Sequence, residues 1–256
     1  MHEDGGVSVM RNRCVTLSIL IVPTQIASML LITILWNVYS TELYIVPPET
    51  GASATYGVLF SLIPITLSFV FARLLKIKGF RALVTLLQSL VVGVSVYVIL
   101  LPFTENLSWI ASTFALMASI WVLARGDSKS KTAFVGVFSI SASILLALSF
   151  PLVAILVFST MLAIFDLYAV FKGPLSKGLP FALVAQVGSM MIGVGDMIFY
   201  ALIPSSLYLH KGVLIGLIAL ILVNLGAIIS AKLLEKRETI PGLPIPLLLT
   251  LPLFII

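Results

Sequence analysis

The chain has 256 residues, of which 60% are hydrophobic and only 10% are charged, and its mean hydropathy is +1.20. Soluble domains carry about 25% charged residues, so this composition excludes a soluble globular protein and predicts an all-α polytopic membrane protein. The formal net charge of +5 does not indicate a nucleic-acid partner, because the basic residues lie between the apolar segments, as membrane topology requires.

The few cysteine and histidine residues leave little room for metal chemistry. The single cysteine, Cys14, excludes an internal disulfide and a CxxC metal site. The two histidines, His2 and His210, lie far apart and near the ends of apolar segments. The sequence therefore predicts neither a metal site nor a cofactor.

Apolar segments long enough to cross a bilayer follow one another along the chain. The first ten residues are polar and are expected to form a loose tail, and the apolar run after Arg13 is too long for the hydrophobic region of a signal peptide. Pro151 divides the 40-residue run 132–171 into two helices. The expected helices cover residues 15–36, 54–75, 82–103, 107–124, 132–150, 152–171, a seventh segment that contains Asp196 and ends near 204–208, 212–231 and 240–256.

The basic residues alternate between connections. Of the 15 lysines and arginines, 14 fall in the N-terminal tail and in every second connection, and only Lys211 lies on the other side. Lys and Arg concentrate on the cytoplasmic side of membrane proteins. The pattern predicts nine transmembrane helices, with the N-terminus in the cytoplasm and the C-terminus outside.

Only two acidic residues lie inside apolar segments, Asp166 in the sixth helix and Asp196 in the seventh. An ionisable side chain at the bilayer centre costs roughly 3 kcal/mol or more, so each marks a functional site by default. At 1.5 Å per residue, Asp166 lies about 9 Å inside the cytoplasmic boundary. Asp196 reaches a similar depth, about 12 Å, only if the seventh helix starts near Gly188. The segment 179–187 is therefore expected to be extended or mobile rather than helical.

Small residues recur at steps of three and four around both acids, which favours close contact between the sixth and seventh helices. They are Ser159, Ala163 and Ala169 around Asp166, and Ala185, Gly188, Ser189 and Gly193 before Asp196. Ordinary helix packing would also explain these small residues.

Two neighbouring carboxyl groups define a chemistry. They cannot both ionise easily, so one serves as a base and the other as an acid. Such a pair can activate water and protonate a leaving amine, which is peptide hydrolysis without a metal, a cofactor or a covalent intermediate. Asp166 and Asp196 are therefore the predicted catalytic residues, and the glycines before Asp196 leave room for a substrate backbone or for the partner helix.

Three motifs resemble those of the presenilin and signal peptide peptidase family of GxGD intramembrane aspartyl proteases. They are Phe-Asp-Leu-Tyr-Ala-Val at 165–170 with Lys-Gly-Pro-Leu at 172–175, Gly-Val-Gly-Asp-Met-Ile-Phe-Tyr at 193–200, and Pro-Gly-Leu-Pro-Ile at 241–245. The resemblance implies a small microbial protease of this kind, which cuts transmembrane helical substrates in the lipid bilayer of the cell membrane. It also implies active-site support from Phe165, Gly193, Gly195, Pro241, Gly242 and Leu243.

The sixth helix is expected to run towards the cytoplasm, as in presenilin-like proteins, whereas signal peptide peptidases are inverted. Two positions depart from the family motifs: Phe165 replaces a tyrosine and Gly242 replaces an alanine. The expected organisation is a single membrane domain over 1–256, with a cytoplasmic tail at 1–13, helices one to five within 14–150 and the catalytic helices six to nine within 151–256.

Two other functions use intramembrane acids. A proton- or cation-coupled transporter, or a leak channel, would use them as a relay, but no inverted internal repeat of the sort common in transporters is visible. A prepilin peptidase also carries a GxGD acid, but the motifs at 165–170 and 241–243 speak against it. The prolines at 241–246 also suit an ordinary helix end.

Overall fold

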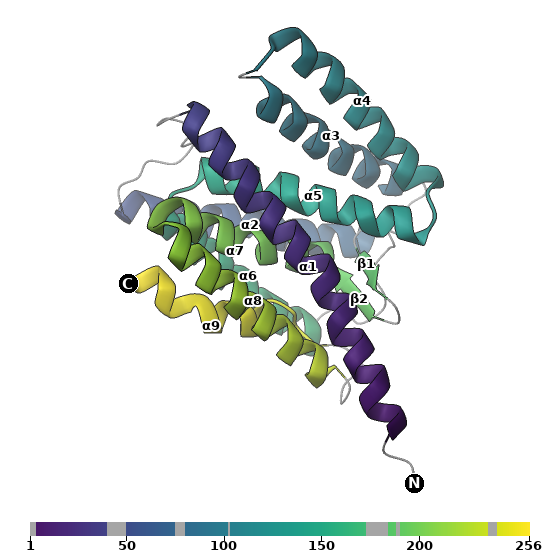
Figure 1. Ribbon diagram of the computed structural model, residues 1–256, viewed down its shortest axis with the longest axis vertical. Helices are drawn as coiled ribbons and strands as arrows, with labels where there is room; N and C mark the ends of the chain where they lie inside the picture. The colour runs from purple at the N-terminus through teal and green to yellow at the C-terminus, as the bar shows by residue number, and fades with distance from the viewer. Residues whose placement is uncertain are drawn as a thin grey trace.

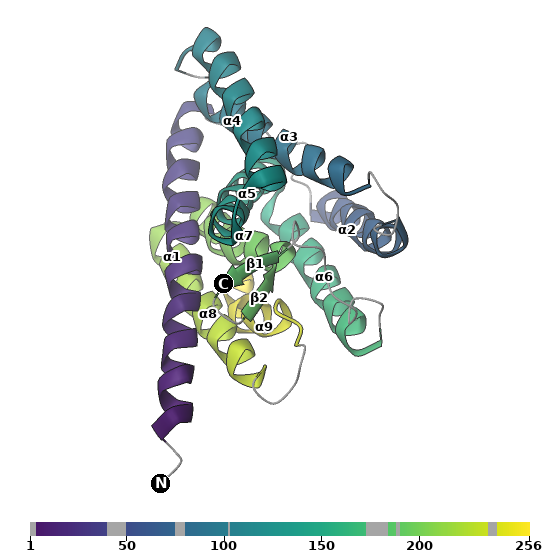
Figure 2. The same cartoon turned by 90° about the vertical axis from the view of Figure 1, so that its right-hand side faces the viewer.

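The computed structural model of the protein describes residues 4–39, 50–74, 80–101, 103–172, 184–187, 190–234 and 240–256. Within these ranges the chain forms nine α-helices and one two-stranded sheet (Figures 1 and 2). In chain order the elements are α1 (Asp4–Tyr39), α2 (Thr50–Leu74), α3 (Phe80–Leu100), α4 (Glu105–Arg125), α5 (Ser128–Ser149), α6 (Leu152–Lys172), β1 (Val184–Val187), β2 (Met190–Gly193), α7 (Val194–Lys211), α8 (Val213–Leu233) and α9 (Pro244–Ile255). A predominantly helical architecture is confirmed.

The predicted bounds of α2 to α6 and of α8 are each within four residues of the observed ones. Pro151 separates α5 from α6, as predicted, because proline cannot donate the hydrogen bond that would continue a helix. The prediction that the first ten residues form a loose tail is wrong, since α1 is helical from Asp4. Extending an existing helix by one residue costs far less than starting a new one.

The seventh helix begins later than predicted. Helix α7 starts at Val194 and follows an antiparallel hairpin in which Val184 pairs with Gly193 and Val187 pairs with Met190. The expected extended conformation is confirmed for 184–187, but the helix start near Gly188 is wrong. Ala185 and Gly193 consequently lie on strands and not on a helical face. Residues 173–183, Gly188 and Ser189 lie outside the described residues.

Six helices of the described chain contain a segment that is long and apolar enough to cross a membrane: α1, α3, α4, α5, α6 and α8. The described parts of α2 and α9 hold shorter apolar segments, Gly51–Thr66 and Pro244–Ile255. The predicted total of nine crossings and the orientation of the termini stay predictions.

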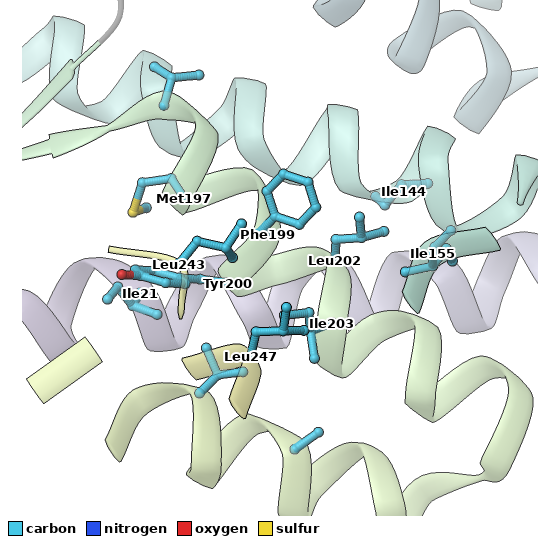
Figure 3. Packing of buried hydrophobic residues seen from close by; sticks show 14 of the residues in the cluster. Ile21, Ile144, Ile155, Met197, Phe199, Tyr200, Leu202, Ile203, Leu243 and Leu247 are labelled. Carbon is cyan, nitrogen blue, oxygen red and sulfur yellow. The ribbon is translucent and has the colours of Figure 1, made fainter. Parts of the chain in front are cut away.

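Helix α7 lies at the centre of the molecule, where it packs against α1, α5 and α8 and also contacts α6 and α9 (Figures 1 and 2). Its side chains from Met197 to Leu207 are almost all buried. They meet residues of four other helices, including Ile21, Ile144, Ile155 and Leu247 (Figure 3). Lipid chains are as apolar as these side chains, so close packing rather than escape from water holds α7 in place.

Buried amide side chains add directed contacts between α1, α7 and α8. The Gln25 side-chain nitrogen donates to the Tyr200 carbonyl at 2.9 Å, and the Asn224 side-chain nitrogen donates to the Gln25 oxygen at 2.6 Å. Hydrogen bonds of this kind join helices within a membrane. They fix the first turns of α7, which carry the site described next.

Candidate active site

The two intramembrane acids lie on different elements. Asp166 is in the last third of α6, and Asp196 is in the first turn of α7, three residues after the helix cap at Gly193. The hairpin β1–β2 ends at Gly193, so it delivers the chain directly to this turn. A carboxylate in a first turn is favoured by the unpaired amides of the helix N-terminus. The two carboxyl groups lie against adjacent residues of one segment, Asp166 against Leu243 and Asp196 against Gly242.

The segment before α9 contacts both acids. The Leu243 backbone N–H donates to Oδ2 of Asp166 at 3.3 Å. Pro244 opens α9 at its first position, where the missing N–H of proline costs nothing. Leu243 is the cap residue of α9, so its N–H has no partner within the helix and can donate to Asp166.

Gly242 also lies against the second acid. A β carbon placed on Gly242 would lie 2.5 Å from Oδ2 and 2.9 Å from Oδ1 of Asp196. Real contacts of a β carbon are almost never below 3.0 Å, so a larger residue at 242 would require the Asp196 carboxyl group to shift from its observed position. Glycine at 242, where the family motif has alanine, therefore leaves the space that the Asp196 carboxyl group occupies.

The structure brings together five of the residues that the sequence indicated: Asp166, Asp196, Gly193, Gly242 and Leu243. It does not bring Gly195 against the site, because a β carbon there would meet no atom of the described residues within 4 Å. Phe165 and Pro241 neighbour the site in sequence, and the first is half-buried while the second is buried.

Tyr200 is a site residue that the sequence prediction did not include. Its hydroxyl donates to the Gly242 carbonyl at 3.0 Å, which ties the segment before α9 to α7. Tyr200 lies four residues after Asp196 on α7, so both side chains share one face of the helix. That spacing was the available signal.

A half-open pocket with a volume of about 80 Å³ adjoins Asp196. It lies among α1, β2, α7, α8 and the segment 240–242, and residues on its wall include Leu17, Ile192, Asp196, Tyr200, Ser230 and Gly242. Asp166 is not on this wall. Ser230 was also not among the predicted site residues, because a single serine in an apolar helix does not indicate a site.

The chemistry available here is that of two carboxyl groups, one of which accepts a hydrogen bond from a backbone amide. Among the described residues, no group of three His, Cys, Asp or Glu side chains is placed to hold a metal ion. The Leu243 amide orients the Asp166 carboxyl group, and the neighbouring half-open pocket gives Asp196 access to space. The arrangement suits acid–base work on a bond placed between the two carboxyl groups.

Comparison with known proteins is informative at the level of structure. No family model matches the chain, and no curated protein matches it either. Among solved structures, the chain is similar to a presenilin family intramembrane aspartate protease, with a TM-score of 0.69 and 15% sequence identity. The similarity covers 94% of this chain and 97% of that one. The chain therefore has a presenilin-like fold and is a multi-pass integral membrane protein.

Proposed function

We propose that the protein is an intramembrane aspartyl protease of the GxGD type, which hydrolyses peptide bonds within transmembrane segments of other membrane proteins. The observation that carries this proposal is the convergence of Asp166 and Asp196 on the backbone at 242–243. The presenilin-like fold supports it at the level of architecture. The comparisons give no support to the transporter alternative.

In the proposed reaction, the ionised carboxylate takes a proton from water, and the water oxygen attacks the peptide carbonyl carbon. The protonated carboxyl group gives its proton to the carbonyl oxygen, so a tetrahedral diol forms and the two acids exchange roles. When the diol collapses, one acid recovers a diol proton while the other protonates the leaving nitrogen. One water molecule is consumed, and the pair returns to its starting state.

The backbone would hold the pair in place for this exchange. The donor at Leu243 orients Asp166, and the space at Gly242 accommodates Asp196. Oriented groups that need no rearrangement during the reaction are the main source of catalytic stabilisation in such sites.

Substrates would be transmembrane helices opened locally at the scissile bond, because a closed helix keeps its amides in internal hydrogen bonds. We propose nine crossings with the N-terminus in the cytoplasm, an orientation that places Lys172 at the cytoplasmic end of α6. Asp166 would then lie near the cytoplasmic face. The whole chain would form one membrane domain, with α6 to α9 as its catalytic part.

The test is cleavage of a single-span helical substrate by the purified protein in detergent or in vesicles. Asp166→Asn and Asp196→Asn should each lower the cleavage rate by at least about a thousandfold, because each keeps the side-chain shape but breaks the proton exchange. The elution profile and the unfolding temperature should stay unchanged. Substantial cleavage by either variant would remove that acid from the mechanism.

Asp127→Asn is the matched control. Asp127 caps α5 by accepting a hydrogen bond from the Ser130 backbone N–H at 3.0 Å. Asparagine is an equally good cap, so the same substitution outside the site should leave cleavage intact. An equal loss of cleavage in this control would attribute the effect to charge or handling rather than to the site.

A further inference from the structure

Pro204 interrupts the hydrogen bonding of α7 close to the candidate site. Proline has no N–H, so it cannot donate to the carbonyl four residues before it, which here belongs to Tyr200. Tyr200 is buried and lies one helical turn after Asp196. A carbonyl that loses its donor inside a membrane raises the free energy of the fold, and neighbouring helices commonly supply the missing partner.

Gln25 of α1 supplies such a partner. Its side-chain nitrogen donates to the Tyr200 carbonyl at 2.9 Å. The Gln25 side chain is fully buried, although glutamine is ordinarily an exposed residue. The orientation of its amide is fixed, because a carbonyl can accept a hydrogen bond only from the nitrogen end. A hydrogen bond between α1 and α7 therefore stands in place of the one that Pro204 removes from α7.

Asn224 of α8 holds the other end of the Gln25 amide. The Asn224 side-chain nitrogen donates to the Gln25 oxygen at 2.6 Å and to the Leu220 carbonyl of its own helix at 2.8 Å. Both ends of the Gln25 amide are thus engaged. The side chain cannot turn away from Tyr200 without giving up two hydrogen bonds.

Tyr200 connects these helices to the candidate catalytic groups. Its hydroxyl donates to the Gly242 carbonyl at 3.0 Å, and Gly242 lies against the Asp196 carboxyl group. A shift of Tyr200 would therefore move both the first turn of α7 and the segment before α9.

We propose that Gln25 is a positioning residue for peptide hydrolysis, a role that rests on the proposed protease function. Gln25 replaces the hydrogen bond that Pro204 withholds from Tyr200, and it thereby fixes the first two turns of α7 relative to the segment before α9. It acts through Tyr200 and not on the bond that is cut. Without its amide, α7 bends at Pro204, where helices kink most readily, and Asp196 moves away from its productive position.

The first test needs no substrate and is a double-mutant cycle on the purified full chain in detergent. Gln25→Met keeps the length of the side chain but removes the amide, so it should lower the unfolding temperature by about 2–4 °C or more. Pro204→Ala returns an N–H to α7, so Gln25→Met should lower that temperature by less than half as much in the Pro204→Ala background. Equal losses in the two backgrounds would overturn the proposal, whether or not the protein cuts peptides.

Folding itself is the readout if Gln25→Met alone does not yield folded protein. Recovery of folded protein in the double variant with Pro204→Ala would then support the replacement of one hydrogen bond by the other. Failure of both variants to fold would overturn it.

Thr33→Val is the matched control. The Thr33 and Tyr208 hydroxyl groups are 2.8 Å apart and join the same two helices at a place away from the Tyr200 carbonyl. The loss of unfolding temperature caused by Thr33→Val should be the same with and without Pro204→Ala. An equal rescue of Thr33→Val would overturn the specific link, because Pro204→Ala would then stabilise α7 in general.

The second test measures cleavage. Gln25→Met should lower kcat about tenfold and leave KM nearly unchanged, because it displaces catalytic groups and not substrate contacts. Pro204→Ala in the same chain should restore most of kcat, which a mere loss of packing at position 25 would not allow. An unchanged kcat in Gln25→Met, or a lowered kcat that Pro204→Ala does not restore, would overturn the positioning role. Cleavage that persists in Asp196→Asn would instead overturn the assignment of that acid in the protease proposal, and the result of the unfolding cycle would still stand.

Discussion

The hairpin of α3 and α4 and the region around α7 are both apolar, yet their sequences shape them differently. The two hairpin helices follow one another after a short turn and stand at the edge of the molecule (Figures 1 and 2). Large side chains of α4, such as Trp109, Phe114 and Trp121, are at least 60% exposed and suit a lipid-facing surface. Helix α7 is enclosed by other helices, begins after a β-hairpin and carries an acid in its first turn.

In α3 and α4 the local sequence pattern agrees with the place of the helices in the fold, whereas around α7 it does not. A transmembrane helix at the edge of the molecule, such as α3 or α4, needs only an uninterrupted apolar run. Around α7, the chain departs from this rule at the hairpin β1–β2, at Asp196 and at the segment before α9. Departures of this kind are expected where a site sets the structure. Changes around α7 should therefore affect cleavage, and changes in the α3–α4 hairpin should affect only stability.

The largest effect expected from conditions alone is that of pH. Cleavage requires one protonated and one ionised carboxyl group, so its rate should follow a bell-shaped curve with an acidic to neutral optimum. Activity falls at low pH because the base is protonated, and it falls at high pH because the acid is ionised. The rate is measured across pH with and without a chelator, which should do nothing. Activity lost in chelator and restored by a metal would indicate a different enzyme class.

Among single substitutions outside the two acids, Gly242→Ala should have the largest effect. The new β carbon would lie 2.5 Å from Oδ2 of Asp196, so the carboxyl group must move. A misplacement of this size can cost about a hundredfold in rate, so a cleavage assay should show a loss of tenfold or more. Gly195→Ala is the control, because its β carbon would meet no atom within 4 Å in the part of the chain that the structure describes. If the two variants cleave equally well, the close approach of Gly242 and Asp196 has no catalytic role.

Gly242 and Gly195 illustrate which features of the molecule could be predicted from the sequence and which could not. Most helices could be placed from apolar length and from breaks such as Pro151, because those signals are local. The acids Asp166 and Asp196 could be found because charge in an apolar segment is costly. An extended segment could be predicted before α7, but the pairing of β1 with β2 could not, because the small residues before Asp196 also fit a helical face. Which glycine lies against a carboxyl group depends on the path of the backbone before α9, which no local pattern encodes.

Tyr200→Phe should have an intermediate effect. It removes the hydroxyl that donates to the Gly242 carbonyl at 3.0 Å but keeps the ring. A hydrogen bond of this type contributes about 1 kcal/mol, so the cleavage rate should fall several-fold. The steady-state assay used for the acids would measure it. A rate equal to that of the unmodified protein would mean that the segment before α9 holds its position without this tie.

The smallest effect is expected in the hairpin. The Ser112 hydroxyl donates to the Gly93 carbonyl at 2.8 Å and joins α4 to α3. Such bonds within a membrane contribute about 0.6 kcal/mol on average, so Ser112→Ala should lower the free energy of unfolding by about that amount. Unfolding in mixed detergent would measure this loss, and cleavage should not change. A strong loss of cleavage would show that the hairpin communicates with the site.

The joint action of Asp166 and Asp196 is tested most directly by binding of a hydroxyl-bearing transition-state mimic to the unmodified protein and to the two single asparagine variants. Transition-state mimics bind at least about a hundredfold tighter than substrates, because they occupy the position between the catalytic groups. If both carboxyl groups hold that hydroxyl, Asp166→Asn and Asp196→Asn should each weaken binding by about a hundredfold or more. A variant that loses cleavage yet binds the mimic as tightly as the unmodified protein would contradict a shared site for the two acids.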